Sequence, residues 1–315
     1  MIIVPRIKTD YVVEGPIENL HVRDMDMRDV QWVLRNNPDS KFSEFQFRYP
    51  CPFGEFGKRL FIPDEDLLYF SDEEAEADDY HNLAVLLRAG IELAVLINKS
   101  DKEDISFFDF HTFNSKFGTM YSEADADDSA SLSLAVPLRN SAMTKRYIDY
   151  VGAVVGPVFS LDHEMTDDKD AALTLNFDSR GAGTNRKEPS WRMKALEKIF
   201  ESFTQFMLVD CSFSFVDKQL TVNANSTIAS LWSAVLNAYN TGEAKTCDVC
   251  GQPFISHGSR GKKAEYCSPA CTKMHQRLEA YYHYINNENL SEEEAASKAK
   301  VSLKRAQEYW TTKLN

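Results

Sequence analysis

Two cysteine pairs decide the C-terminal part of the chain: Cys247-Asp248-Val249-Cys250 and, after 16 intervening residues, Cys267-Ser268-Pro269-Ala270-Cys271. Paired cysteines at these separations are typical of a tetrahedral zinc site with four protein ligands. Gly251 allows a tight turn after the first pair. Ser268 and Pro269 are typical of the cap and first position of a helix, so the second pair should lie at a helix start. We therefore expect a structural Zn²⁺ bound by Cys247, Cys250, Cys267 and Cys271.

Two alternatives to this ligand set stay open. In the first alternative, the four cysteines are free thiols. In the second, either His257 or His275 replaces one of the cysteines as a ligand. With four protein ligands the zinc coordination is complete, whereas a catalytic zinc keeps one position for water. The sequence therefore predicts a closed, structural site.

The charge of the chain is divided unevenly. Residues 1–243 carry 24 basic and 40 acidic side chains, whereas residues 244–315 carry 11 basic and 8 acidic ones. The formal net charge of -13 over 315 residues excludes a basic coat for nucleic acid, because binding to phosphates needs clustered positive charge. A local basic patch is still compatible with it. The change in charge and in cysteine content predicts a domain boundary near Gly242.

No segment of the sequence indicates a membrane partner or secretion. Met1–Lys8 lacks a basic stretch followed by a long apolar run. The longest apolar stretch, Leu83–Ile97, is 15 residues long and contains two charged side chains, which is short for a membrane span. We expect a cytoplasmic protein, and in a reducing compartment clustered cysteines favour metal over disulfides.

Residues 1–242 are predicted to form a mixed α+β domain that senses a signal or mediates assembly. Phe45–Tyr49 is expected to be a strand, His81–Asn98 a helix, and the Phe213–Val222 segment a hairpin. We find no pattern of paired acid and base residues in this domain, so an enzyme or effector activity is the least favoured reading.

Three expected features together resemble a treble-clef zinc finger. They are the Cys247–Cys250 turn (the knuckle), a hairpin over Gln252–Tyr266, and the helix that begins after Ser268 and carries Cys271. More narrowly, Cys247–Arg277 resembles the CGNR-type fingers of bacterial regulatory proteins, although this chain has Cys271-Thr272-Lys273-Met274 in place of Cys-Gly-Asn-Arg. The resemblance covers 31 residues and implies a transcription regulator. The matching residues are Cys247, Cys250, Phe254, Arg260, Lys262, Lys263, Tyr266, Cys267, Ser268 and Cys271.

The finger (243–287) is followed by a helical tail (288–315). Ser291-Glu292-Glu293-Glu294 is a capping box that starts a helix predicted over Glu292–Lys300. Val301-Ser302 forms a turn before a second predicted helix, Leu303–Lys313. This pair resembles a helix-turn-helix, with Lys300 where a glycine is common.

These features predict a zinc-finger transcription regulator that binds DNA through its C-terminal module, with Leu303–Lys313 as recognition helix. The alternative is a zinc-stabilised adaptor that binds a protein partner or forms a homodimer, in which the tail packs on the zinc unit. The expected DNA contacts are Arg260, Lys262, Lys263, Lys304, Arg305, Gln307 and Thr311.

Overall fold

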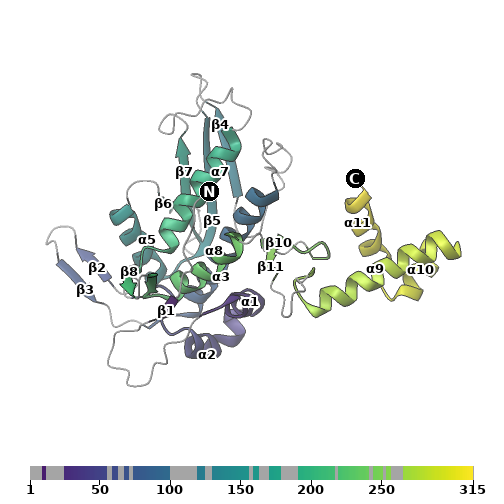
Figure 1. Ribbon diagram of the computed structural model, residues 1–315, viewed down its shortest axis with the longest axis horizontal. Helices are drawn as coiled ribbons and strands as arrows, with labels where there is room; N and C mark the ends of the chain where they lie inside the picture. The colour runs from purple at the N-terminus through teal and green to yellow at the C-terminus, as the bar shows by residue number, and fades with distance from the viewer. Residues whose placement is uncertain are drawn as a thin grey trace. The chain divides into compact units, whose positions relative to one another are not determined.

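The computed structural model divides the chain into two compact units, Met1–Gly242 and Glu243–Asn315 (Figure 1). The part of the chain that it describes is mostly helical, with nine helices. The described residues are 9–11, 25–54, 59–62, 67–70, 74–99, 119–124, 130–155, 159–162, 170–178, 191–216, 219–240, 244–250, 253–256 and 265–314.

A long apolar helix, α3, forms the centre of the first unit. It packs against the other five helices described in this unit and against strand β5. The predicted helix His81–Asn98 is confirmed and begins earlier than expected. The helices of this unit are α1 (Met27–Arg35), α2 (Pro38–Arg48), α3 (Ala77–Lys99), α5 (Ala142–Val155), α7 (Trp191–Met207) and α8 (Thr227–Asn240).

Helix α3 is also the one described helix that is long and apolar enough to cross a membrane, over Ala77–Ile97. In that stretch, 78% of the residues are buried inside the protein. The core helix of a soluble protein has the same length and composition, so this stretch is weak evidence for a membrane span. The apolar stretch Leu83–Ile97 noted in the sequence is thus part of a longer helix.

The strands of the first unit pair mostly antiparallel. A four-stranded sheet has the order β4-β5-β7-β6, and α7 packs on its strands β5 and β7. Leu134 and Leu175 are register partners in this sheet, and both are fully buried. The predicted hairpin is confirmed as β8 and β9, to which β1 adds in parallel. The strands are β1 (Thr9–Tyr11), β2 (Arg59–Ile62), β3 (Leu67–Phe70), β4 (Thr119–Ala124), β5 (Ala130–Arg139), β6 (Phe159–Asp162), β7 (Asp170–Asp178), β8 (Cys211–Val216) and β9 (Gln219–Ala224).

The start of α3 and the start of α5 are joined by a buried carboxylate. Asp79 is only 1% exposed. Its Oδ1 accepts hydrogen bonds from the Ser141 hydroxyl, from the Thr144 backbone N–H at 3.1 Å and from the Thr144 hydroxyl at 2.8 Å. Its Oδ2 accepts from the Glu76 backbone N–H at 2.9 Å. One acidic side chain therefore satisfies donors at two helix starts.

The expectation of a strand at Phe45–Tyr49 is wrong, because most of this segment is the end of α2. Asn37 caps α2 through its side chain, and Pro38 occupies the first turn. Phe45 is buried, with its ring centroid 5.5 Å from that of Tyr80 on α3. Packing against α3 therefore favours the helix here and outweighs the preference of an aromatic segment for a strand.

The second unit combines a short strand pair with three helices. Strand β10 (Ala244–Thr246) pairs antiparallel with β11 (Pro253–Ile255), so the Cys247–Cys250 knuckle lies between them. The hairpin expected over Gln252–Tyr266 stays a prediction, because residues 257–264 lie outside the described residues. The helices are α9 (Pro269–Glu288), α10 (Glu292–Ala299) and α11 (Leu303–Leu314).

Candidate metal centre

The four predicted cysteine ligands lie together. The Sγ atoms of Cys247, Cys250, Cys267 and Cys271 all lie within 4.8 Å of one another. The Cys250–Cys267 and Cys267–Cys271 sulfur distances are both 3.4 Å. Zn–S bonds of about 2.3 Å in a tetrahedron place neighbouring sulfurs about 3.8 Å apart, whereas a disulfide needs about 2.0 Å. The group can therefore hold a metal ion and is consistent with a zinc site.

Backbone geometry at both cysteine pairs explains this convergence. The Cys250 backbone N–H donates to the Cys247 carbonyl at 3.3 Å, which closes the knuckle. Ser268 caps α9, and its hydroxyl accepts from the Cys271 backbone N–H at 3.1 Å. Pro269 is in the first turn of α9, so the predicted helix start is confirmed. The cap thus fixes Cys271 beside Cys267 at the positive end of the helix.

The thiols of this group influence one another's ionisation. Burial opposes ionisation of Cys247, but backbone N–H groups of Cys267, Cys250 and Val249 outweigh it and lower its pKa. Burial and the adjacent thiols of Cys250, Cys271 and Cys247 raise the pKa of Cys267. Adjacent thiolates repel one another, so a bound divalent cation is what allows all four to ionise.

Histidine replacement of a cysteine ligand finds no support in the described residues. His275 stacks on Tyr266 with ring centroids 4.7 Å apart, and its Nε2 lies 3.2 Å from the Glu279 carboxylate. The other candidate, His257, lies outside the described residues.

The Cys247–Cys250 knuckle packs against the helical tail. The tail and α9 share a core in which Leu278, Tyr281 and Tyr309 are the large buried side chains and four alanines fill the space between them. Val249, between two ligand cysteines, packs against this core. The Val249 carbonyl also accepts a hydrogen bond of 3.4 Å from the Arg305 guanidinium. The knuckle and the tail are thus one packed structure.

The tail helices follow the predicted pattern. The capping box of Ser291 and Glu294 is present, so that prediction is confirmed. Lys300 ends α10 with φ 57° and ψ 47°, the left-handed conformation that glycine adopts most readily. In a helix-turn-helix, glycine is common at this position. The backbone here has the conformation that favours glycine, but the residue is a lysine.

Four of the predicted DNA contacts lie on α11 and are exposed: Lys304, Arg305, Gln307 and Thr311. Three of them also contact their own unit. Gln307 donates to Glu292 at 2.6 Å, Lys304 lies 3.9 Å from Glu308, and Arg305 reaches the knuckle as described above. Arg260, Lys262 and Lys263 lie outside the described residues.

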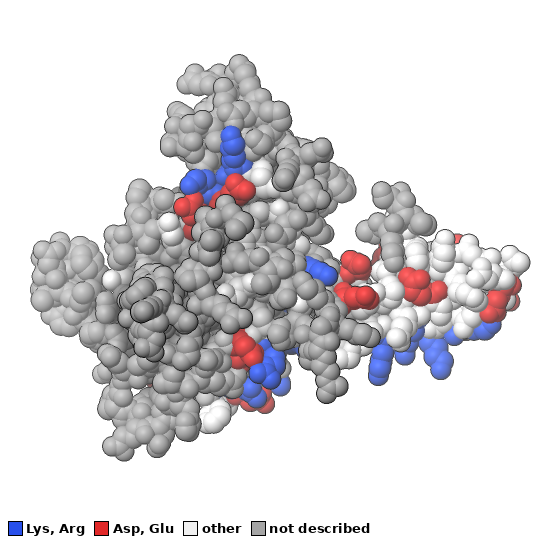
Figure 2. Space-filling model, viewed as in Figure 1, with Lys and Arg blue, Asp and Glu red and all other residues white. Residues whose placement is uncertain are grey.

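One further basic pair was not among the predicted DNA contacts. Lys273 and Arg277 are one helical turn apart on α9 and both are exposed. Figure 2 shows Lys and Arg side chains along one edge of this unit. A helix periodicity count on Pro269–Glu288 could have found this pair.

The two cysteines of the first unit do not form a second site with the other described residues. Burial, with the nearby Asp210 carboxylate, raises the pKa of Cys211 to about 12. A thiol with that pKa stays protonated and is a poor nucleophile, as expected of a core cysteine.

Comparisons with known proteins find no relative of this chain. No protein-family model matches it, and neither does any curated protein or any solved structure.

Proposed function

We propose that this chain is a cytoplasmic, bacterial-type transcription regulator with an N-terminal α+β domain and a zinc-stabilised module that binds DNA. The observation that carries the proposal is the four-sulfur cluster at the start of α9, packed on a two-helix tail. The knuckle between β10 and β11, followed by a ligand-bearing helix, supports a treble-clef finger of the CGNR type.

A closed structural role for the zinc follows from the ligand set. Four cysteines satisfy tetrahedral zinc without water, so the ion stabilises the fold and does not activate a substrate. Its four thiolates and two positive charges together add two negative charges, which lowers the net charge of residues 244–315 from +3 to +1. DNA binding by this module therefore depends on how its basic side chains are arranged.

Basic residues on two helices support DNA as the partner. On α11, Lys304 and Arg305 are exposed. Both lie in the first turn of the helix that would read the major groove of DNA. On α9, Lys273 and Arg277 add two positive charges that suit phosphate contacts. Together with the three basic residues expected between β11 and α9, they would supply the positive surface of the module.

The tail contacts favour a second candidate, a protein-interaction adaptor. Gln307 and Lys304 are engaged by Glu292 and Glu308, and these acidic side chains repel phosphate. Tyr282 is 40% exposed and stacks on Trp310 at 4.3 Å, which offers an aromatic surface to a protein or to a second copy.

Gel retardation of the full chain on random duplex DNA, repeated over a series of salt concentrations, separates the two candidates. A DNA-binding module retards the duplex at low salt and loses affinity steeply as salt rises. Replacing Lys304 and Arg305 together by alanine should weaken binding and reduce the salt slope by about two. Lys145→Ala, at an exposed position of α5, is the control and should change neither. No retardation of the wild-type chain at low salt excludes DNA and favours the adaptor.

A further inference from the structure

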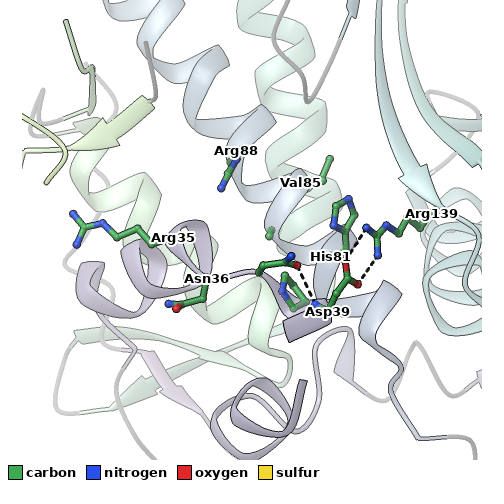
Figure 3. Close-up of a pocket in the computed structure, with 10 residues that line it drawn as sticks. Arg35, Asn36, Asp39, His81, Val85, Arg88 and Arg139 are labelled. Carbon is green, nitrogen blue, oxygen red and sulfur yellow. Dashed lines mark hydrogen bonds and ion pairs between the residues drawn. The ribbon is translucent and has the colours of Figure 1, made fainter. Parts of the chain in front are cut away.

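The first unit contains a cavity of about 290 Å³ that lies between four elements. It is lined by the end of α1, the start of α2, one face of α3 and the end of β5 (Figure 3). The Arg139 guanidinium donates to Asp39 at 2.7 and 3.0 Å and to Asp78 at 2.9 Å. The Arg88 guanidinium donates to the Leu34 backbone carbonyl. These bonds tie the wall together, so the cavity is a junction of the fold.

Reactive side chains are concentrated instead in the second unit, where four cysteines form the sulfur cluster. Cys247 is fully buried, whereas Cys250, Cys267 and Cys271 are half-buried. Oxidation of a cysteine depends on its thiolate character and on its exposure. Cysteines bind zinc as thiolates, and partial exposure allows a small oxidant to approach three of the four residues.

Cys267 takes part in two short sulfur contacts of the cluster. Its Sγ lies 3.4 Å from that of Cys250 and 3.4 Å from that of Cys271. A disulfide bond measures about 2.0 Å, so an approach of about 1.4 Å joins the sulfurs of either pair. Cys267 is therefore placed to form a disulfide with either of two neighbours.

A cysteine of the first unit provides a comparison. Burial, with the nearby Asp210 carboxylate, raises the pKa of Cys211 to about 12. Its thiol stays protonated, and a protonated thiol reacts slowly with oxidants. Cys211 is therefore not the residue that an oxidant attacks first.

We propose that the cluster is a redox switch, in which hydrogen peroxide converts Cys267 and one of its two neighbours into a disulfide. The inference rests on the zinc-stabilised module proposed above. The Cys267 thiolate takes one oxygen atom from hydrogen peroxide, becomes a sulfenic acid and releases hydroxide. The thiolate of Cys250 or Cys271 then attacks this sulfur and displaces the oxygen as a second hydroxide. Two thiolates thus lose two electrons to the peroxide, and the two hydroxide ions take up protons to form water.

Disulfide formation removes two of the four ligands. A structural zinc site needs all four, so the oxidised chain releases the ion and the second unit loses the stabilisation that it supplies. The effect reaches the tail, because Val249 of the knuckle packs against the core of α9, α10 and α11. A thiol reductant reverses the disulfide, so reduction and readdition of zinc restore the unit.

The test treats the zinc-loaded full chain with a small molar excess of hydrogen peroxide. Zinc release is followed with a metal-sensitive dye, the thiols are counted, and the disulfide is located by mass spectrometry of peptides. We expect zinc release in step with the loss of two thiols per chain, a disulfide that includes Cys267, and recovery with dithiothreitol and zinc. Zinc retention under peroxide overturns this inference alone, whereas a purified chain without zinc overturns the structural zinc site and this inference with it.

Two variants locate the switch. Cys267→His keeps a zinc ligand, because three cysteines and one histidine form a common structural site, but it removes the sulfur shared by the two short contacts. This variant should bind zinc and release it under peroxide at least about tenfold more slowly than the wild type. The double variant Cys51→Ser, Cys211→Ser changes only cysteines outside the cluster and should respond as the wild type. Release at the wild-type rate from zinc-loaded Cys267→His overturns the proposal, as does loss of the response in the double variant.

The disulfide map of the wild-type chain decides the case in which Cys267→His does not bind zinc. A bond from Cys267 to Cys250 or to Cys271 supports the switch. A bond between Cys247 and Cys250, or between two chains, overturns it.

Discussion

Dialysis of the full chain against a strong zinc chelator is expected to unfold the second unit and leave the first unit folded. The large side chains buried in the core of the second unit are Leu278, Tyr281 and Tyr309. Each stabilises the fold by about 1.5–3 kcal/mol, before the cost of ordering the chain. Structural zinc supplies about 10–16 kcal/mol in finger peptides, which is as large as the whole net stability of a typical domain, about 5–15 kcal/mol.

The expected signal can be worked out from the helix lengths. Helices α9, α10 and α11 contain 20, 8 and 12 residues, about a third of the helical residues that the structure describes. Chelation should therefore remove about a third of the helical circular-dichroism signal at 222 nm. The thermal transition of the first unit should stay where it was, since the six helices there contain no part of the sulfur cluster.

Two cysteine variants control this experiment. Cys271→Ser removes a ligand and should purify with little zinc, already lacking the helical signal of the second unit. Cys51→Ser changes a thiol outside the cluster and should keep one zinc per chain by elemental analysis. The reasoning fails if the wild-type chain contains no metal, or if chelation leaves the circular-dichroism spectrum unchanged.

Three further predictions concern the packing of the fold. Asp79→Ala leaves three buried donors and one part-buried donor without their acceptor and should lower the free energy of unfolding by about 3–5 kcal/mol in urea titrations, whereas Asp149→Ala at an exposed position of α5 should change it by less than about 0.5 kcal/mol. Lys300→Gly relieves a left-handed lysine and should raise the stability of the second unit by about 1 kcal/mol in thermal scans; a lower midpoint would contradict the assigned backbone. Gly90→Ala should destabilise the first unit by at least about 2 kcal/mol, because its Cβ would lie 2.2 Å from the Trp232 ring, and an unchanged unfolding curve would show that α3 and α8 are further apart.

The cluster of four cysteines could be predicted from sequence because the signals that form it are local. The spacing of each cysteine pair, the Ser268 cap and Pro269 all act within a few residues, and the structure places the four sulfurs together. The tail helices were predictable for the same reason, since Ser291 and Glu294 form their capping box within one turn.

The errors lie where distant packing decides the structure. Phe45 prefers a strand by its own chemistry, and its packing against Trp32 and against Tyr80, 35 positions away, favours the helix instead. Helix α1 was not among the elements predicted from sequence, although Asp26 and Asp29 form a capping box, which is a local signal for its start.

The cavity of the first unit had no sequence signature at all. Leu34, Arg88 and Arg139 come from three separate segments, and no periodic pattern relates them. The cavity forms only once α1, α3 and β5 are packed.

The position of Val249 has a thermodynamic consequence. Cys247 and Cys250, on either side of it along the chain, belong to the four-sulfur cluster, while its own side chain packs against the core shared with α10 and α11. With zinc at the cluster, a partner that binds only the ordered tail would also tighten zinc binding, by the same factor by which zinc would tighten binding of the partner. A shortage of the metal and a shortage of the partner would therefore have the same effect: each would lower the fraction of chains in which the second unit is ordered.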